Sequence, residues 1–332
     1  MKVLFLVADE LMPSSRVRVV NLLPELNQAG ITATIFPYPR SLKGKLKLPR
    51  LCRRHDVTFL QKKMPSPLEA LLLRRFSHRL VFDFDDAIIY RHDAREELES
   101  WSRQLKFDWL LRQTDLVVAG NPILASHAAR KARRIVVVPS AVETRNIPSQ
   151  LHTHQASSVV IGWVGTSGNL HHLLNLAQVI QKLASHCPIV LRVVSDKPIA
   201  LSGVQVEHVV WRLETQEQEI ARFDIGIMPL PQTRFAEGKC GYKALQYMAA
   251  AVPPVVSDVG VNGQIVEHGR SGWVAKTSDD FYDGLLNLVN SPALRLELGR
   301  NARERVEAHY SIPVIGRQLA TELIRVAQGW RA

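Results

Sequence analysis

The first feature able to do chemistry is a short loop that combines two glycines with two lysines. Gly238, Lys239, Gly241 and Lys243 follow an apolar run, and a predicted helix begins at Tyr242. Glycine lets the backbone approach a ligand, lysine neutralises phosphate charge, and the amino end of a helix favours anions. The loop therefore predicts a diphosphate site that needs no metal. The alternative is a tight turn with two solvated lysines.

A second loop with anion-binding character follows another apolar run. Gly165, Thr166 and Ser167 precede a helical stretch that we predict over residues 170–186. Free amide groups and two hydroxyls at the start of that helix would hold an anion, or would form an ordinary helix cap. This loop does not carry GxGxxG, and GxxxxGK[ST] occurs nowhere in the sequence, so a nicotinamide or P-loop nucleotide site is disfavoured.

Apolar strands that alternate with amphipathic helices must position these loops. In the first half we predict strands at residues 2–8, 32–37, 57–61, 79–84, 115–120 and 134–139. In the second half we predict strands at residues 159–165, 189–195, 206–211, 224–230, 253–257 and 272–275. Strands that are apolar nearly throughout and separated by helices are typical of parallel sheets covered on both faces.

The length of 332 residues also favours two α/β domains over one. We place the first domain at residues 1–145, a polar linker at 146–157 and the second domain at 158–312. A helix over residues 313–332 is a candidate for packing back on the first domain. Ligands of doubly wound sheets bind at the carboxyl ends of the strands, so a cleft between two facing domains is where we expect the chemistry.

Charge and cysteine content narrow the partners and the compartment. The chain carries 42 basic and 31 acidic residues, and the stretch Arg40–Arg54 has seven cations and no acid. Such a surface favours an anionic partner. The three cysteines are widely spaced, so neither a disulfide framework nor a zinc site is predicted. With no run of about 20 apolar residues and no secretory signal, we expect a cytoplasmic protein or one peripheral to the inner face of the plasma membrane.

Five segments occur in an order known from one enzyme family. They are SSRVRVVNLLPEL, VFDFDDAI, TDLVVAGNPILASHA, IGWVGTSGNLHHL and the long block that runs from DIGIMPLP through EGKCGYKALQYMAAAVPPVVS to GRSGWVA. This order resembles family 4 of the retaining glycosyltransferases, within the glycosyl transferases group 1. The resemblance implies the GT-B fold, with two Rossmann-like domains facing a central cleft. It also implies a nucleotide-diphosphate sugar as donor, with no metal and no other cofactor.

The resemblance assigns roles around the donor. Members of the family carry two glutamates separated by seven residues, which fall here on Glu237 and Gln246, separated by eight. Glu237 would then lie near the transferred sugar, and Gln246 would accept hydrogen bonds from ribose hydroxyls. Lys239 and Lys243 join Glu237 as catalytic residues because they would stabilise the departing diphosphate. The predicted donor-binding residues are Gly165, Thr166, Ser167, Gly238, Gly241, Tyr242 and Gln246.

The acceptor is expected on the first domain. Asp83, Asp85 and Asp86 end a predicted strand, where they could hold a divalent cation, bind the hydroxyls of an incoming sugar or cap a helix. We favour the sugar, because the metal-binding version belongs to the single-domain GT-A fold. Arg16 and Arg18 follow the first strand and would grip an anionic acceptor such as a lipid diphosphate, or lie on a solvated helix face.

These residues predict a retaining hexosyltransferase acting on a glycan or lipid-linked acceptor in cell-envelope polysaccharide synthesis. Two alternatives come from other classes. Glutamine at position 246 and the shifted Glu237 also suit a catalytically silent protein that binds a nucleotide sugar. A nucleic-acid-binding protein is disfavoured, because Arg40–Arg54 lacks interleaved aromatic residues. The same stretch would instead associate with an anionic membrane.

Overall fold

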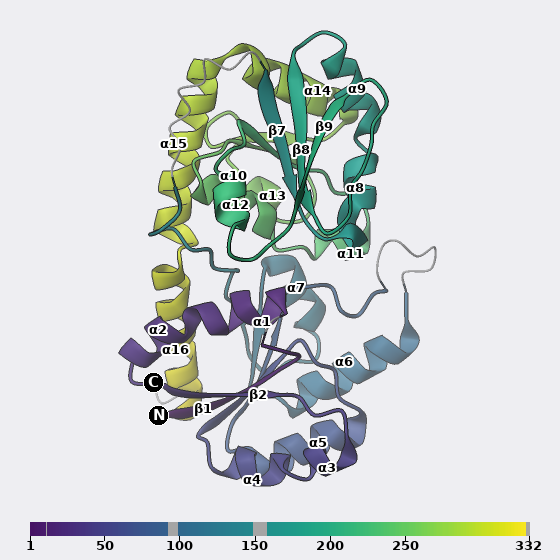
Figure 1. Cartoon of the computed structure of the whole chain (residues 1–332). Coiled ribbons are helices and arrows are strands. Elements are labelled where there is room, and N and C mark those ends of the chain that lie inside the picture. Colours follow the sequence, from purple (N-terminus) through teal and green to yellow (C-terminus); the bar gives the residue numbers. More distant parts are fainter. Residues whose placement is uncertain (11, 92–98, 149–157, 330–332) are drawn as a thin grey trace. The chain divides into compact units, whose positions relative to one another are not determined.

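The computed structural model describes residues 1–10, 12–91, 99–148 and 158–329, and the chain divides into two compact units (Figure 1). The first unit consists of Met1–Ala141, Thr233–Cys240 and Ile312–Ala332. The second unit consists of Val142–Gln232 and Gly241–Ser311. Each unit is therefore assembled from segments that are distant in the sequence.

A parallel six-stranded sheet forms the centre of the first unit. Its order is β2 (Thr32–Pro37), β1 (Lys2–Val7), β3 (Val57–Gln61), β4 (Leu80–Phe84), β5 (Leu116–Ala119) and β6 (Ile135–Val137). The four strands β1, β3, β4 and β5 are buried almost throughout, as their apolar sequences predict. The strand order changes direction between β1 and β3, so ligands are expected at the carboxyl ends of these strands.

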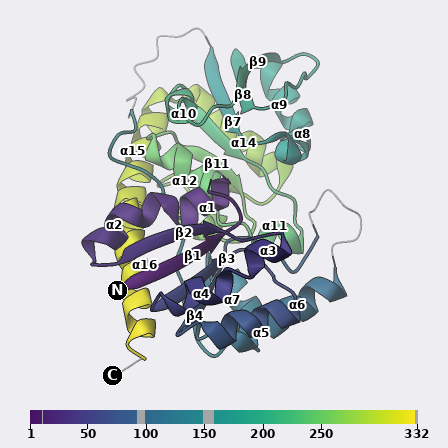
Figure 2. The ribbon, with the colours of Figure 1, turned by 60° about the horizontal axis from the view of Figure 1, so that its bottom comes forward.

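Helices cover both faces of this sheet (Figure 2). One group comprises α1 (Pro13–Arg18), η1 (Val20–Leu22), α2 (Leu23–Gln28) and α16 (Ile312–Ala327). The other comprises α3 (Leu42–Lys45), α4 (Leu48–Arg53), α5 (Pro67–Phe76), α6 (Trp101–Gln113) and α7 (Pro122–Ala128), and α11 (Arg234–Glu237) joins the unit from the second half of the chain. The single helix predicted over residues 14–29 is wrong: it is divided into α1, η1 and α2. Pro24 has no amide hydrogen to donate to the preceding turn, so it fits only in the first turn of a helix, here α2, which begins at Leu23.

The second unit also has a parallel six-stranded sheet. Its order is β12 (Trp273–Ala275), β11 (Pro254–Ser257), β10 (Ile225–Met228), β7 (Val159–Val164), β8 (Ile189–Ser195) and β9 (Gln205–Val210). Its helices are η2 (Ser167–Asn169), α8 (Leu170–Leu174), α9 (Ala177–Ala184), α10 (Gln216–Ile220), α12 (Tyr242–Ala249), α13 (Asn262–Ile265), α14 (Ser278–Asn290) and α15 (Pro292–His309). The switch in strand order lies between β7 and β10.

Tyr247 of α12 fixes this helix on the sheet. A Cβ atom on Gly226 of β10 would lie 2.4 Å from the Tyr247 ring, so glycine is needed for their contact. The Tyr247 hydroxyl donates to the carbonyl of Ile227 at 3.1 Å and accepts from the amide of Val164 at 3.2 Å. The helix that follows the glycine and lysine loop is thus held over the two strands at the switch point.

The prediction of two doubly wound parallel α/β domains is confirmed. Among the described residues, no helix is long and apolar enough to cross a bilayer.

Candidate functional site

The candidate donor site of the second unit lies at the carboxyl end of β7, where the strand order changes direction. Lys243 of α12 places its ammonium group 5.2 Å from the centre of the Trp163 ring, which belongs to β7. A Cβ atom on Gly165 would come within 3.0 Å of Lys243 Cε and 2.6 Å of the Trp163 ring. Gly165 therefore leaves the space that Lys243 occupies, and the predicted donor-binding residue Gly165 lies beside the predicted catalytic residue Lys243.

The rest of the predicted anion loop is engaged by an aspartate. The carboxylate of Asp196, just after β8, accepts from the Ser167 amide at 2.5 Å and from the Ser167 hydroxyl at 2.7 Å. The side-chain and backbone hydrogen bonds from Ser167 lower the pKa of Asp196. Thr166 accepts a hydrogen bond from Asn169 at 3.2 Å. The backbone amide and the hydroxyl of Ser167 are therefore both hydrogen-bonded to a protein carboxylate in this structure.

The first turn of α12 carries two further predicted donor-binding residues, Gly241 and Tyr242. Gly241 is the N-cap with φ +64°, and a Cβ atom there would lie 2.3 Å from Ile265 Cδ1. Only glycine adopts this left-handed conformation freely, so the chain can begin α12 directly after the turn. Tyr242 is the first residue of the helix. Its backbone amide and that of Lys243 lie in the first turn, where amide groups have no acceptor within the helix.

Gln246 lies one turn further along α12 and is buried. Its side-chain amide donates to Gln216 Oε1 at 3.4 Å, and Trp211 Nε1 donates to the same oxygen at 3.2 Å. A small pocket that includes Tyr242 and Gln246 borders this pair; its remaining lining residues are Val142, Ile147, Glu217, Ile220 and Ala250. Gln216 was not foreseen, because it comes from α10, a short helix with no sequence motif.

The preceding part of the loop packs within the first unit. The side-chain amide of Asn121, at the start of α7, donates to the carbonyls of Gly238 at 3.1 Å and Lys239 at 3.3 Å. A Cβ atom on Gly238 would lie 2.6 Å from Ala87 Cβ. The thiol of Cys240 donates to the Asp85 carbonyl at 3.2 Å. Glu237, Gly238 and Lys239 are therefore in the first unit, whereas Gly241 and Lys243 are in the second.

Lysines neutralise the acidic cluster of the first unit. Lys62, which follows β3, lies 3.1 Å from Asp85 and is ion-paired with Asp86. Lys239 approaches the other oxygen of Asp86 at 3.1 Å. Lys62 was missed in the sequence analysis, although a cation directly after a buried strand was a usable signal. In the part of the chain that the structure describes, no group of three or more His, Cys, Asp or Glu is arranged to hold a metal.

Asp83 has a different environment from the other two aspartates. It is fully buried, and both of its oxygens accept from Arg18, whose side chain is 3% exposed. Arg18 also donates to the Val138 carbonyl at 2.6 Å. Burial acts to lower the pKa of Arg18, but the Asp83 carboxylate outweighs it and raises that pKa. Arg16 is half-buried, and its side chain makes no hydrogen bond or ion pair with any described residue.

Glu237 ends α11, near His127 of α7. Burial lowers the pKa of His127, and the Glu237 carboxylate opposes that change. The ring of His127 lies edge-on to Tyr90 at 5.8 Å between centroids. The structure thus gives Glu237 a histidine neighbour that the sequence analysis did not include.

The pairing of Asp86 predicts a pH dependence of stability. Burial acts to raise the pKa of the Asp86 carboxyl, but the ammonium groups of Lys239 and Lys62 outweigh it and hold the pKa below its ordinary value. Because the pKa of this carboxyl is lower in the folded protein than its unfolded-state value of about 4, its ionised form stabilises the folded protein above about pH 4. This stabilisation is lost as the pH falls through the folded-state pKa. We expect the wild type to exceed Asp86→Asn in stability at pH 7 and to lose that advantage below about pH 4. Urea denaturation of both proteins across this range tests it, and a pH-independent difference would contradict it.

The comparison with protein families concerns the segment that contains the candidate donor site. Residues 158–291 match the family model described as Glycosyl transferases group 1. The matched segment runs from β7 through α14 and includes Gly165, Lys243 and Gln246. No curated protein sequence matches the chain. The family match, together with the fold, supports a glycosyltransferase of the GT-B type.

Solved structures resemble the chain over nearly its full length. Sucrose-phosphate synthase from Thermosynechococcus elongatus has a TM-score of 0.74 and 14% identity and covers 99% of both chains. Anabaena HepE in complex with UDP-glucose has a TM-score of 0.73 and 15% identity, covering 98% of this chain and 100% of HepE. A glycosyltransferase from Rickettsia africae has a TM-score of 0.71 and 12% identity and covers 98% of both chains. At these identities the likeness concerns the fold, and the GT-B prediction is confirmed.

Proposed function

We propose that the protein is a retaining glycosyltransferase that uses a nucleotide-diphosphate sugar and belongs to family 4. One observation carries the proposal: Lys243 lies beside Gly165 at the carboxyl end of β7, inside the segment that matches group 1 glycosyltransferases. The structure of HepE with UDP-glucose supports a nucleotide sugar as the donor, because it has the same fold. The substrate of this chain would be a hexose donor of that class.

In this proposal the second unit binds and activates the donor. The bond between the anomeric carbon and the β-phosphate oxygen breaks, and an acceptor hydroxyl forms the new bond on the same face of the sugar. The proton of that hydroxyl passes to the departing diphosphate. Negative charge develops on the departing diphosphate, and Lys243 together with the first amide groups of α12 would stabilise it. Gln246 would accept hydrogen bonds from the ribose hydroxyls through its side-chain carbonyl.

The first unit would bind the acceptor, a glycan or a lipid-linked sugar of the cell envelope. Asp85 and Asp86 would accept hydrogen bonds from the hydroxyls of the acceptor. Glu237 would lie near the transferred sugar. Asp83 would not contact the acceptor directly, since its carboxylate is buried against Arg18. We propose that the reaction needs no metal, because Lys62 and Lys239 already neutralise Asp85 and Asp86.

A second candidate function is a catalytically silent protein that binds a nucleotide sugar. It is favoured by one observation: Gln246, in place of an acidic residue, is hydrogen-bonded to Gln216. Such a protein would bind the donor but neither hydrolyse it nor transfer its sugar.

Thermal denaturation with UDP, GDP, ADP and TDP and their sugars is the test of the proposed function. Ligand that binds only the folded state at 100 times its Kd stabilises it by about 2.7 kcal/mol, so one nucleotide family should raise Tm clearly. Hydrolysis or transfer of the sugar from that donor should follow. Stabilisation without turnover would favour the accessory protein, and no stabilisation by any nucleotide would contradict both.

A further inference from the structure

The helices on one side of the first unit expose many large apolar side chains. Of the twelve large apolar residues found exposed in the described parts of the chain, eight lie on or next to α3, α5 and α6. Leu42 and Leu46 are exposed by 77% and 73%, and Trp101 by 83%. The other five are Leu68, Leu71, Leu72, Leu105 and Trp109. We call these eight side chains the apolar patch.

The helices that carry the apolar patch are neighbours (Figures 1 and 2). Lys45 of α3 is ion-paired with Glu69 of α5, which ties the first helix to the second. Trp109 of α6 donates from its ring nitrogen to the carbonyl of Pro67 at 3.0 Å, which ties the third helix to the second. On α6, Trp101, Leu105 and Trp109 are spaced by four residues and therefore follow one side of the helix.

Cations are abundant around the part of the apolar patch that α3 and α5 carry. Residues 40–76 contain eleven lysines and arginines and two acids, Asp56 and Glu69. Both acids are engaged, since Asp56 accepts from the amide of Lys2 at 2.7 Å and Glu69 is paired with Lys45. Lys43 and Lys47 are exposed beside Leu42 and Leu46. Three of the eleven cations are paired with acids, namely Lys45 with Glu69, Lys62 with Asp85 and Asp86, and Arg74 with Asp115. The other eight leave a net positive charge beside the apolar side chains.

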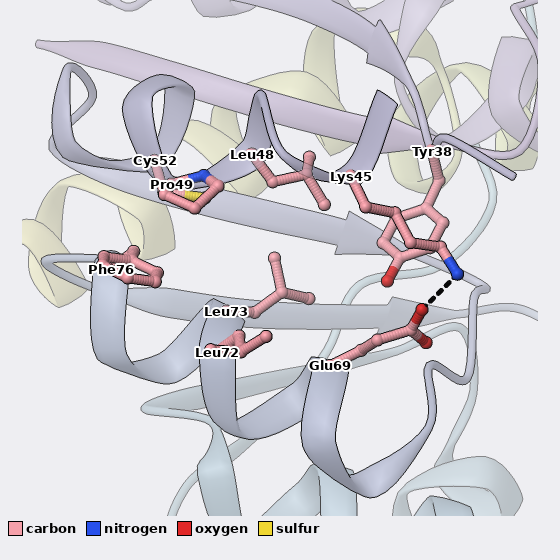
Figure 3. A pocket seen from close by; sticks show the side chains of 9 residues that line it. All are labelled: Tyr38, Lys45, Leu48, Pro49, Cys52, Glu69, Leu72, Leu73 and Phe76. Atoms are coloured by element: carbon pink, nitrogen blue, oxygen red, sulfur yellow. Dashed lines mark ion pairs between the residues drawn. The ribbon is translucent and has the colours of Figure 1, made fainter. Parts of the chain in front are cut away.

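A cavity of about 50 Å³ opens between α4 and α5 (Figure 3). Leu48, Leu73 and Phe76 form part of its apolar lining, and Leu72 of the apolar patch also borders it. The ion pair of Lys45 and Glu69 lies at one end. Apolar surface thus continues from the patch toward the interior between the two helices.

We infer that the apolar patch and its surrounding cations bind the surface of an anionic lipid bilayer. Leucine and tryptophan side chains insert at the boundary between headgroups and acyl chains, while lysines and arginines contact anionic headgroups. The inference goes beyond the proposed function, because it needs neither donor nor acceptor. It also extends to α5 and α6, beyond the Arg40–Arg54 stretch that the sequence analysis identified.

Other occupants fit the face less well. A two-fold dimer would place the same cationic surface on both sides of the interface, where like charges repel. A nucleic acid would contact the cations, but exposed leucines gain little from a phosphate backbone. A lipid surface satisfies both the charge and the apolar side chains.

Flotation of the full chain with vesicles tests the inference. We expect binding to phosphatidylcholine vesicles that contain phosphatidylglycerol and little binding to phosphatidylcholine alone. Lys43→Gln/Lys47→Gln should lower the partition coefficient about thirtyfold, since each basic residue near such a surface contributes about 1 kcal/mol. Leu42→Ser/Leu46→Ser should also lower it at least about tenfold, because two leucines no longer insert.

Two control variants match these changes outside the apolar patch. Val210→Ser/Leu213→Ser removes exposed apolar side chains from the second unit, and Arg130→Gln/Arg133→Gln removes exposed cations from another part of the first unit. Both should bind vesicles like the wild type.

The inference is overturned if the chain does not float with anionic vesicles, or if the controls weaken flotation as much as the patch variants do. It is also overturned if the leucine variant alters only self-association measured by sedimentation, or if an RNA or DNA oligonucleotide binds equally well with and without the leucines. Since the vesicles carry no nucleotide sugar, these results do not depend on the proposed transferase activity.

Discussion

Replacing Lys243 with alanine is expected to lower kcat for sugar transfer by about 100- to 1,000-fold, as removal of one donor to a developing anion does in other enzymes. The ammonium group lies over Trp163 and against Gly165, where a departing diphosphate would need a positive charge. Because that charge grows in the transition state, the loss should appear in kcat more than in KM. Kinetics with the donor identified by thermal denaturation measure both constants.

Lys182 provides a matched control for this variant. It also belongs to the second unit and lies over an aromatic ring, 4.0 Å from the centre of Tyr282. Lys182→Ala removes an equivalent contact away from β7 and should leave kcat within about twofold, as expected for a surface change distant from the site. If Lys243→Ala retains full turnover while remaining folded, Lys243 does not stabilise the leaving group.

Replacing Asp83 with alanine is expected to lower the free energy of unfolding of the first unit by about 3–5 kcal/mol. The change would leave the guanidinium of Arg18 buried without its carboxylate, and removing one partner of a buried ion pair costs far more than removing both. The double variant Arg18→Met/Asp83→Leu should therefore recover most of the loss. Urea denaturation of the three variants measures the coupling.

An exposed ion pair provides the control for the stability cost of breaking the buried one. Arg222 and Glu219 form an ion pair in which the arginine side chain is 59% exposed, so Arg222→Met should cost less than about 1 kcal/mol. An equally small cost for Asp83→Ala would show that the buried pair does not stabilise the first unit.

The two sheets were predictable because their strands are apolar almost without interruption. Such runs are typical of strands buried on both faces, and the turns between them are marked by glycine, proline and polar residues. Helix continuity was less predictable. The stretch over residues 170–186 is divided into α8 and α9, although its apolar pattern suits a single helix.

The partners of the candidate site residues depend on strand pairing, which local sequence does not reveal. Lys62 reaches Asp85 and Asp86 because β3 and β4 are neighbours, with Gln61 in register with Asp83. The association of Lys239 with the first unit depends on Asn121, which is more than a hundred residues away. Asp196 reaches Ser167 because β8 lies beside β7. The residue types were visible in the sequence, but these long-range contacts were not.

The most direct test of the account is a crystal structure of the protein with UDP, or with whichever nucleoside diphosphate stabilises it most. We expect the diphosphate in the second unit, within hydrogen-bonding distance of Lys243 and the first amides of α12, at the carboxyl end of β7. A nucleotide bound elsewhere, or held only through a cation on Asp83, Asp85 and Asp86, would contradict the account.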